Sequence, residues 1–358
     1  MAYTSDLRMK NIIKDIHIDI INILKKERID VELELRVFDE STEDSKLFEQ
    51  GGLTFKDPYV DLILGSNDAG WIINGKPLVI VEGTFGTERG QFGDGQLNRF
   101  SHSAAVAMNG YVGVTLIPFN GESYSKSGTK PKEIESSNIK IKYAKIHKGF
   151  LTGALSISKK EKGYFLVMDA YDRNKLIELV VESVKQRIKI NNKFEEVVQD
   201  ILIKMKAKIG KSNYGERSKQ TINSLYNNKG EIISKKSRFY TQNYAALTTS
   251  EKRDGHGMLG KNLIEIFSCD EDLTYSIFIR LDKVEIEKLK LRKSKEFKYI
   301  FEHPKIKVIS FDDLVFTDKE LKDKVLNLRK INIFQERQNE LIKTIQHGFN
   351  IGSIRILN

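Results

Sequence analysis

The sequence predicts an α/β protein with a mixed central sheet flanked by helices. Three observations lead to this fold class: short apolar runs bounded by glycine, helical spacing of apolar residues between these runs, and 40% hydrophobic residues in a chain of 358. This length can bury a core as one large domain or two ordinary ones. No run of eighteen apolar residues and no secretory leader pattern occurs, so we expect a cytoplasmic protein without a membrane segment.

Strand and helix patterns alternate in the first part of the chain. Apolar residues recur every three or four positions after residue 5, whereas VELELRVF alternates apolar and charged residues. Glycine-punctuated apolar runs then predict a strand followed by a hairpin. In chain order we expect a helix over 6–26, strands over 31–38, 59–64, 71–74 and 77–84, a helix over 96–109 and a strand over 111–117.

The pattern breaks at a polar loop over residues 120–138, and a different region follows. It contains a predicted strand over 164–168, helices over 173–188 and 194–208, strands over 263–267, 275–280 and 307–309, and charged helix over 318–345. We therefore expect a core domain over residues 1–155 and an α+β region over 156–358.

Cysteine content and charge restrict the possible functions. The only cysteine, Cys269, excludes an internal disulfide and a thiolate zinc cluster. The net charge is +10 and the isoelectric point is about 9.2. Residues 201–261 carry thirteen Lys and Arg against four acids, so most of the excess lies in one segment. Such a segment suits phosphate contacts, and the alternative is a solvated basic loop.

The basic segment also contains tyrosines, amides and hydroxyl side chains that can hydrogen-bond to base edges. His256 lies in the glycine-punctuated loop EKRDGHGMLGK, which indicates either a DNA-contacting loop or an ordinary turn. The candidate DNA-binding residues of the segment are Lys235, Lys236, Arg238, Lys252, Arg253 and His256.

Two carboxylates interrupt apolar strands and are the strongest chemical signal. Asp61 lies in YVDLIL and Glu82 lies in VIVEGT, on two strands that we expect to be adjacent. A buried unpaired charge is costly unless a cation or a partner offsets it. Magnesium is commonly held by one or two carboxylates, with water and phosphate in the remaining positions. The two acids therefore predict a magnesium site, and the alternative is that each pairs with a nearby Lys or Arg.

These residues resemble the motif of the restriction-endonuclease-like nucleases, which is Pro-Asp, a spacer, then Glu-x-Lys. Pro58 precedes Asp61 by three positions, twenty residues intervene, and Glu82-Gly83-Thr84 follows, so the likeness covers about residues 1–120. It implies a restriction-endonuclease-like fold in which Asp61, Glu82 and the Gly83 carbonyl bind Mg²⁺. The chain departs from the pattern at the proline spacing and at Thr84, an uncharged residue in the catalytic lysine position.

The residues after the motif supply further candidates. The stretch FGTERGQFGDG lets the backbone approach a phosphate, and its Glu88 can complete the metal shell or act as a base. Gln96, Arg99 and Ser103 form a polar stripe on the following helix, directed near the end of the catalytic strands, and Gln96 and Arg99 are candidate DNA-binding residues. The alternatives are that Glu88 is an exposed charge and that Arg99 pairs with an acid of the fold. His102 either contacts phosphate or is an ordinary helical histidine.

The leading hypothesis is a type II restriction endonuclease that cleaves duplex DNA with Mg²⁺ as a homodimer. A repair or recombination nuclease of the same fold is the second hypothesis. The chain has no P-loop or helicase motif, so we expect no nucleotide cofactor. A non-catalytic DNA-binding protein with a degenerate site is the third, motivated by Thr84.

Overall fold

The computed structural model describes residues 4–38, 53–60, 62–83, 91–117, 119, 148–209, 221–235, 237–242, 263–264, 266–267, 274–279, 282–290, 301–330 and 335–357. The chain divides into two compact units. The first unit is Met1–Gly215 with His256–Ser268, and the second is Glu216–Gly255 with Cys269–Asn358. The boundary expected at residue 155 falls inside the first unit, because the strand and two helices that follow it pack onto the first unit's sheet.

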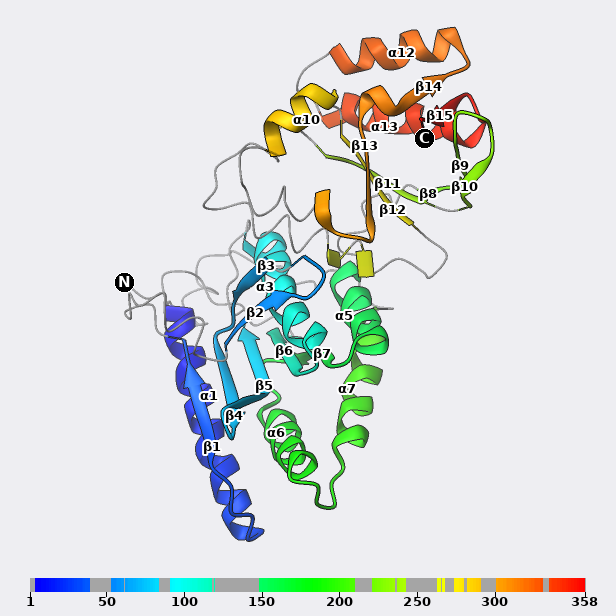
Figure 1. Cartoon of the computed structure of the whole chain (residues 1–358). Helices are drawn as coiled ribbons and strands as arrows, with labels where there is room; N and C mark the ends of the chain where they lie inside the picture. The colour runs from blue at the N-terminus through cyan, green and yellow to red at the C-terminus, as the bar shows by residue number, and fades with distance from the viewer. Residues whose placement is uncertain are drawn as a thin grey trace. The chain divides into compact units, whose positions relative to one another are not determined.

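A five-stranded mixed sheet forms the centre of the first unit (Figure 1). In the order of the sheet, the first three strands pair antiparallel with one another, and the third, fourth and fifth strands pair parallel, so the central strand belongs to both groups. This arrangement confirms the predicted α/β class with a mixed central sheet. The strand order is β1 (Leu33–Val37), β4 (Ala69–Ile73), β5 (Lys76–Gly83), β6 (Val112–Ile117) and β7 (Tyr164–Asp169).

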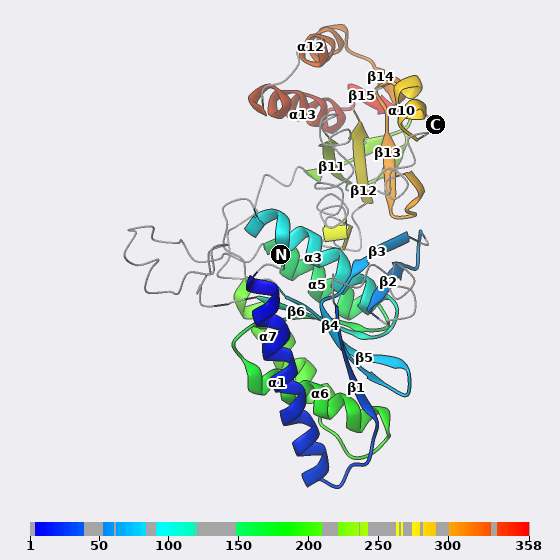
Figure 2. The same cartoon turned by 90° about the vertical axis from the view of Figure 1, so that its left-hand side faces the viewer.

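Among the described residues, five helices surround this sheet. They are α1 (Thr4–Lys26), α3 (Gln91–Met108), α5 (Lys148–Lys160), α6 (Arg173–Arg187) and α7 (Phe194–Ile209). Four of them confirm predicted helices, and α5 was not predicted. Every residue of β4 and β6 is buried, as expected for strands covered on both faces. Helices α3 and α5 lie side by side (Figure 2), and Phe100 of α3 packs against Phe150 and Phe165 with ring centroids 5.1 and 5.0 Å away.

A small hairpin of β2 (Thr54–Asp57) and β3 (Leu62–Ser66) forms a separate two-stranded sheet that packs against α3. Of the strand predicted over 59–64, residues 62–64 lie in β3 and residues 59–60 do not, and the prediction that this strand lies next to the strand of Glu82 was wrong. Residues 58–60 form a turn in which the Tyr59 N–H donates to Asp57 Oδ1 over 2.7 Å. The neighbours of β5 are β4 and β6, and β3 pairs with β2 instead.

Among its described residues, the second unit contains a four-stranded sheet, three α-helices and two two-stranded sheets. Its core gathers ten buried apolar side chains, including Val325, Ile345 and Phe349. The sheet order is β13 (Ile306–Ile309), β12 (Thr274–Ile279), β11 (Ser237–Gln242) and β8 (Thr221–Ile222). The other elements are α10 (Lys283–Lys290), α12 (Lys319–Lys330), α13 (Gln335–Asn350), β9 (Leu225–Tyr226) with β10 (Ile232–Ser234), and β14 (Leu314–Phe316) with β15 (Ile354–Ile356).

Several predicted elements of the C-terminal region are confirmed, among them the strands near 275–280 and 307–309 and the helices within 318–345. The strand predicted over 263–267 was wrong, because its described residues, 263–264 and 266–267, are helical. Short apolar runs do not by themselves distinguish a strand from a buried helical turn. None of the described helices has the length and apolar character needed to cross a membrane.

Candidate functional site

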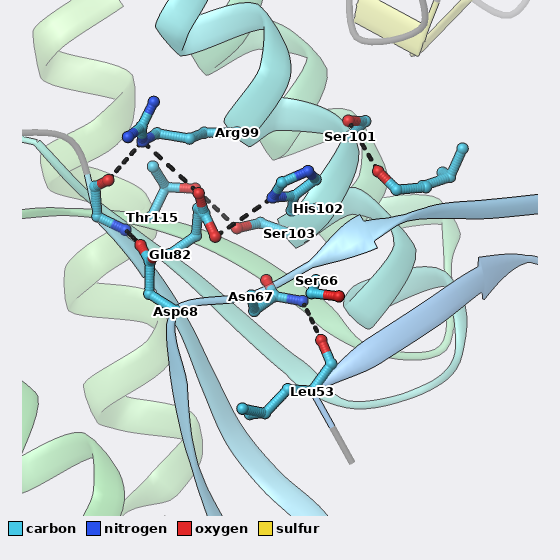
Figure 3. Close-up of polar contacts among 12 residues, drawn as sticks. Leu53, Ser66, Asn67, Asp68, Glu82, Arg99, Ser101, His102, Ser103 and Thr115 are labelled. Carbon is cyan, nitrogen blue, oxygen red and sulfur yellow. Dashed lines mark hydrogen bonds and ion pairs between the residues drawn. The ribbon is translucent and has the colours of Figure 1, made fainter. Parts of the chain in front are cut away.

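Glu82 lies near the end of β5 and is 4% exposed. Two residues of α3 contact its carboxylate (Figure 3): Arg99 Nε lies 3.6 Å from Oε1, and His102 Nδ1 lies 3.3 Å from Oε2. Oε2 is buried and makes no hydrogen bond with the described residues, since its contact with His102 lacks hydrogen-bond geometry. The alternative in which Arg99 and Glu82 pair with each other within the fold is therefore present in the structure.

The backbone of Gly83 connects this carboxylate to a second one. The Gly83 N–H donates to Asp68 Oδ2 over 2.8 Å, and the Gly83 carbonyl accepts a short hydrogen bond from Arg99 Nε (Figure 3). Asp68 stands directly before β4, whose Ala69 pairs with Val81 of β5. Antiparallel pairing thus brings Asp68 to the end of β5 that carries Glu82.

Asp68 is a functional candidate that the sequence interpretation missed. The segment GSNDAG was taken only as the spacer before a hairpin. An informative signal was available, because Asp68 directly precedes the strand that forms a hairpin with the strand of Glu82. In such a hairpin, the start of the first strand and the end of the second lie side by side. Thirteen residues separate the two acids.

Three residues of the predicted catalytic set, Asp61, Thr84 and Glu88, lie outside the described residues. The structure does describe Leu62–Ser66, the strand that follows Asp61, and it pairs with β2. Of the predicted metal ligands, Glu82 and Gly83 are therefore described, and Asp61 stays a prediction.

Helix α3 presents a polar face to the sheet. Arg99, His102 and Ser103 are spaced i, i+3 and i+4, so they lie on one side of the helix. Ser103 Oγ lies 2.8 Å from Thr115 Oγ1, and Thr115 of β6 is the register partner of Glu82. The predicted polar stripe thus reaches the site through Arg99 and Ser103. Gln96 also lies on α3, but its side chain is outside the described residues.

Gly65 allows His102 to occupy its place beside Glu82. A Cβ atom at Gly65 would lie 2.1 Å from His102 Nε2, and the backbone φ of +127° also disfavours other residues. The imidazole is therefore enclosed between the β3 backbone and the Glu82 carboxylate. His102 is part of the candidate site, and its helical position alone could not distinguish it from an ordinary surface histidine.

The site offers three oxygen-donor groups at the shared end of β4 and β5: the Asp68 carboxylate, the Glu82 carboxylate and the Gly83 carbonyl. Hard oxygen ligands suit Mg²⁺, and the buried Glu82 Oε2 atom without a hydrogen bond fits a cation ligand. Within the described ranges no group of three or more His, Cys, Asp and Glu side chains is arranged for a metal. Two carboxylates with a backbone carbonyl and water satisfy the usual Mg²⁺ requirement.

The predicted DNA-binding residues are described only in part. Lys235 is exposed directly after β10, and the backbone of Arg238 lies in β11. Two other lysines of the basic segment make structural contacts: Lys204 pairs with Asp200 at 3.2 Å, and Lys208 Nζ donates to the Phe119 carbonyl over 2.9 Å. Lys236, Lys252, Arg253 and His256 lie outside the described residues.

Comparison of the chain with protein-family models, with curated proteins and with solved structures finds no match in any of the three.

Proposed function

We propose that this chain is a magnesium-dependent endonuclease that cleaves duplex DNA, of the restriction-endonuclease-like group. The observation that carries the proposal is the convergence of Asp68, Glu82 and the Gly83 carbonyl at the shared end of the β4–β5 hairpin. In the motif that the sequence resembles, two acids and the carbonyl after the second acid hold the metal. Asp68 takes the place of the first acid in this proposal.

The donor atoms have separate roles. Asp68 Oδ2 accepts the Gly83 N–H, which fixes the orientation of its carboxylate toward β5. Glu82 offers Oε2, which makes no hydrogen bond with the described residues. Asp68, Glu82 and the Gly83 carbonyl would hold Mg²⁺. Bound there, Mg²⁺ supplies charge that polarises a phosphate oxygen and lowers the pKa of a coordinated water.

Arg99 is the cationic side chain that could take the role of the lysine that the motif has and this chain lacks. Its Nε atom lies within hydrogen-bond reach of the Gly83 carbonyl and 3.6 Å from Glu82, and its side chain is 26% exposed. A guanidinium retains its charge at all physiological pH values and can bind phosphate through two parallel N–H groups. We assign Arg99 the stabilisation of charge on the cleaved phosphate.

The proposal that duplex DNA is the substrate rests on the charge of the chain. The net charge of +10 is concentrated in residues 201–261, where neutralised phosphates would release counterions. A symmetric homodimer would place two such sites on the two strands of a palindrome. Specific cleavage of DNA by a homodimer is therefore the form of the activity that we propose.

Digestion of phage DNA with and without MgCl₂ tests the proposal. Discrete and reproducible fragments that disappear with EDTA support a restriction enzyme. Cleavage confined to branched or damaged DNA supports a repair nuclease of the same fold. Binding without cleavage of any DNA supports the non-catalytic alternative and contradicts the nuclease proposal. Glu82→Gln is the control, because the amide keeps the size of the side chain and removes its charge.

A further inference from the structure

Arg99 contacts two of the groups that would hold the proposed metal, the Gly83 carbonyl and the Glu82 carboxylate, where it approaches Oε1 and not Oε2. Its Nε atom donates to the Gly83 carbonyl and lies 3.6 Å from Glu82 Oε1. A carbonyl or carboxylate lone pair that accepts a guanidinium N–H is not available to a cation in the same direction. The guanidinium and a divalent cation would also repel each other at such short range, where little water screens them.

We propose that Arg99 is an internal counter-ion of the cation site, and that it competes with the divalent cation for Glu82 and the Gly83 carbonyl. This inference rests on the proposed function. It adds that metal binding requires the guanidinium to leave these two oxygens. Arg99 thus lowers the affinity for metal, although it stabilises the carboxylate of the metal-free protein.

The surroundings of the two basic residues on Glu82 indicate which of them can move. The Arg99 side chain is 26% exposed, so its guanidinium has access to solvent. His102 is 16% exposed, and its ring lies directly against the backbone of Gly65. His102 touches Oε2, whereas Arg99 touches Oε1 and the carbonyl. Arg99 alone of the two contacts the Gly83 carbonyl and is the more exposed, so it is the competitor, and His102 is the comparison residue on the same carboxylate.

Mn²⁺ binding by the full chain, measured by electron paramagnetic resonance of the free ion, tests this inference without relying on activity. We expect Arg99→Gln to bind Mn²⁺ about tenfold or more tightly than the wild type, within the usual range of coupling between two ligands. Arg99→Lys keeps a charge but loses the planar guanidinium, and we expect an intermediate gain. His102→Gln should give a smaller gain than Arg99→Gln, because His102 does not contact the Gly83 carbonyl. Unchanged or weaker binding in Arg99→Gln overturns the inference.

Thermal unfolding provides a second readout and a check that the variants fold. In EDTA, Arg99→Gln should unfold at a lower temperature than the wild type, because the buried Glu82 charge loses its counter-ion. Saturating Mg²⁺ should then raise the unfolding temperature more in Arg99→Gln than in the wild type, since tighter binding to the folded state stabilises it more. An equal rise in both proteins counts against competition.

The same titrations separate this inference from the nuclease proposal. Tighter Mn²⁺ binding in Arg99→Gln that is abolished by adding Glu82→Gln supports the competition, even if no DNA is cut. That result without cleavage would contradict the proposed function alone. Binding that persists after Glu82→Gln lies at another site and overturns the inference. No Mn²⁺ binding in folded wild type and in folded Arg99→Gln overturns both.

Discussion

The Gly83 N–H donates a 2.8 Å hydrogen bond to Asp68 Oδ2, and this bond joins the two acids of the candidate site through one backbone amide. The pairing of Ala69 with Val81 sets the register that makes it possible. The position of Asp68 beside Glu82 is therefore fixed, because strand pairing sets that position and a long loop does not.

Asp68→Asn tests this assignment against the acid that the sequence alone suggested. An asparagine oxygen can still accept the Gly83 N–H, so the fold should be retained, but the charge that binds a cation is lost. We expect cleavage to fall about a thousandfold, since several kcal/mol of transition-state stabilisation depends on the metal. Asp61→Asn is the comparison. Loss of cleavage in Asp61→Asn with full activity in Asp68→Asn would return the first ligand to Asp61.

Gly65→Ala should destabilise the protein by about 2 kcal/mol or more. The new methyl group would lie 2.1 Å from His102 Nε2, and the φ of +127° strains any residue other than glycine. Urea unfolding measures the loss. Because the clash depends on the imidazole, adding His102→Ala should recover part of the stability. Strictly additive effects of the two substitutions would show that the ring does not pack against Gly65.

Thr115→Val should cost about 1–3 kcal/mol, because it leaves the buried Ser103 hydroxyl without its 2.8 Å partner. The matched variant Ser103→Ala removes the other hydroxyl of the pair. The double variant should be less destabilised than the sum of the two single variants, as chemical denaturation can measure. A zero coupling energy would contradict the hydrogen bond between them.

Acid should weaken the second unit through His303. Burial, together with the nearby charge of Lys305, lowers the pKa of His303 to about 4. Between the unfolded pKa of about 6.5 and the folded value, the unfolded chain binds a proton that the folded chain does not. Stability should therefore be lost as the pH falls from about 6.5 to 4, on the order of 3 kcal/mol in total.

His303→Gln is the control for this prediction, because glutamine cannot take up the proton. Hydrogen exchange of the β13 amides reports on the second unit directly. Their protection should fall more steeply with acid in the wild type than in His303→Gln. Carboxylates such as Asp313, whose lowered pKa also makes stability fall in acid, are common to both proteins. Equal pH dependence in the two proteins would contradict the role of His303.

Local patterns predicted most of the first unit's elements. The apolar residues of β5 and β6 and the helical spacing in α1 and α6 reflect burial against the sheet, and that burial is written directly in the sequence. The β2–β3 hairpin was not predicted, because strand pairing depends on partners elsewhere in the chain. Because both Asp61 and Asp68 stand next to apolar runs, the sequence pattern without the hairpin pointed to Asp61 as the first metal ligand.

The candidate site was predictable where residue type alone carried the signal. Glu82 stands out as a charge inside a buried strand, and Arg99 falls on the helix that follows. The contact of His102 with Glu82 was not predictable, because it depends on the absent Cβ of Gly65, a residue 37 positions earlier. A contact between a glycine backbone and a distant ring leaves no periodic pattern.

Single-turnover cleavage of plasmid DNA by the wild type and by Glu82→Gln tests the central claim most directly, with DNA binding measured on the same samples by fluorescence anisotropy. We predict that the wild type with Mg²⁺ cuts the supercoiled plasmid. Glu82→Gln should bind the DNA with similar affinity and cut it about a thousandfold more slowly or not at all. Cleavage by Glu82→Gln at the wild-type rate, or no cleavage by the folded wild type with any duplex DNA, would contradict the account.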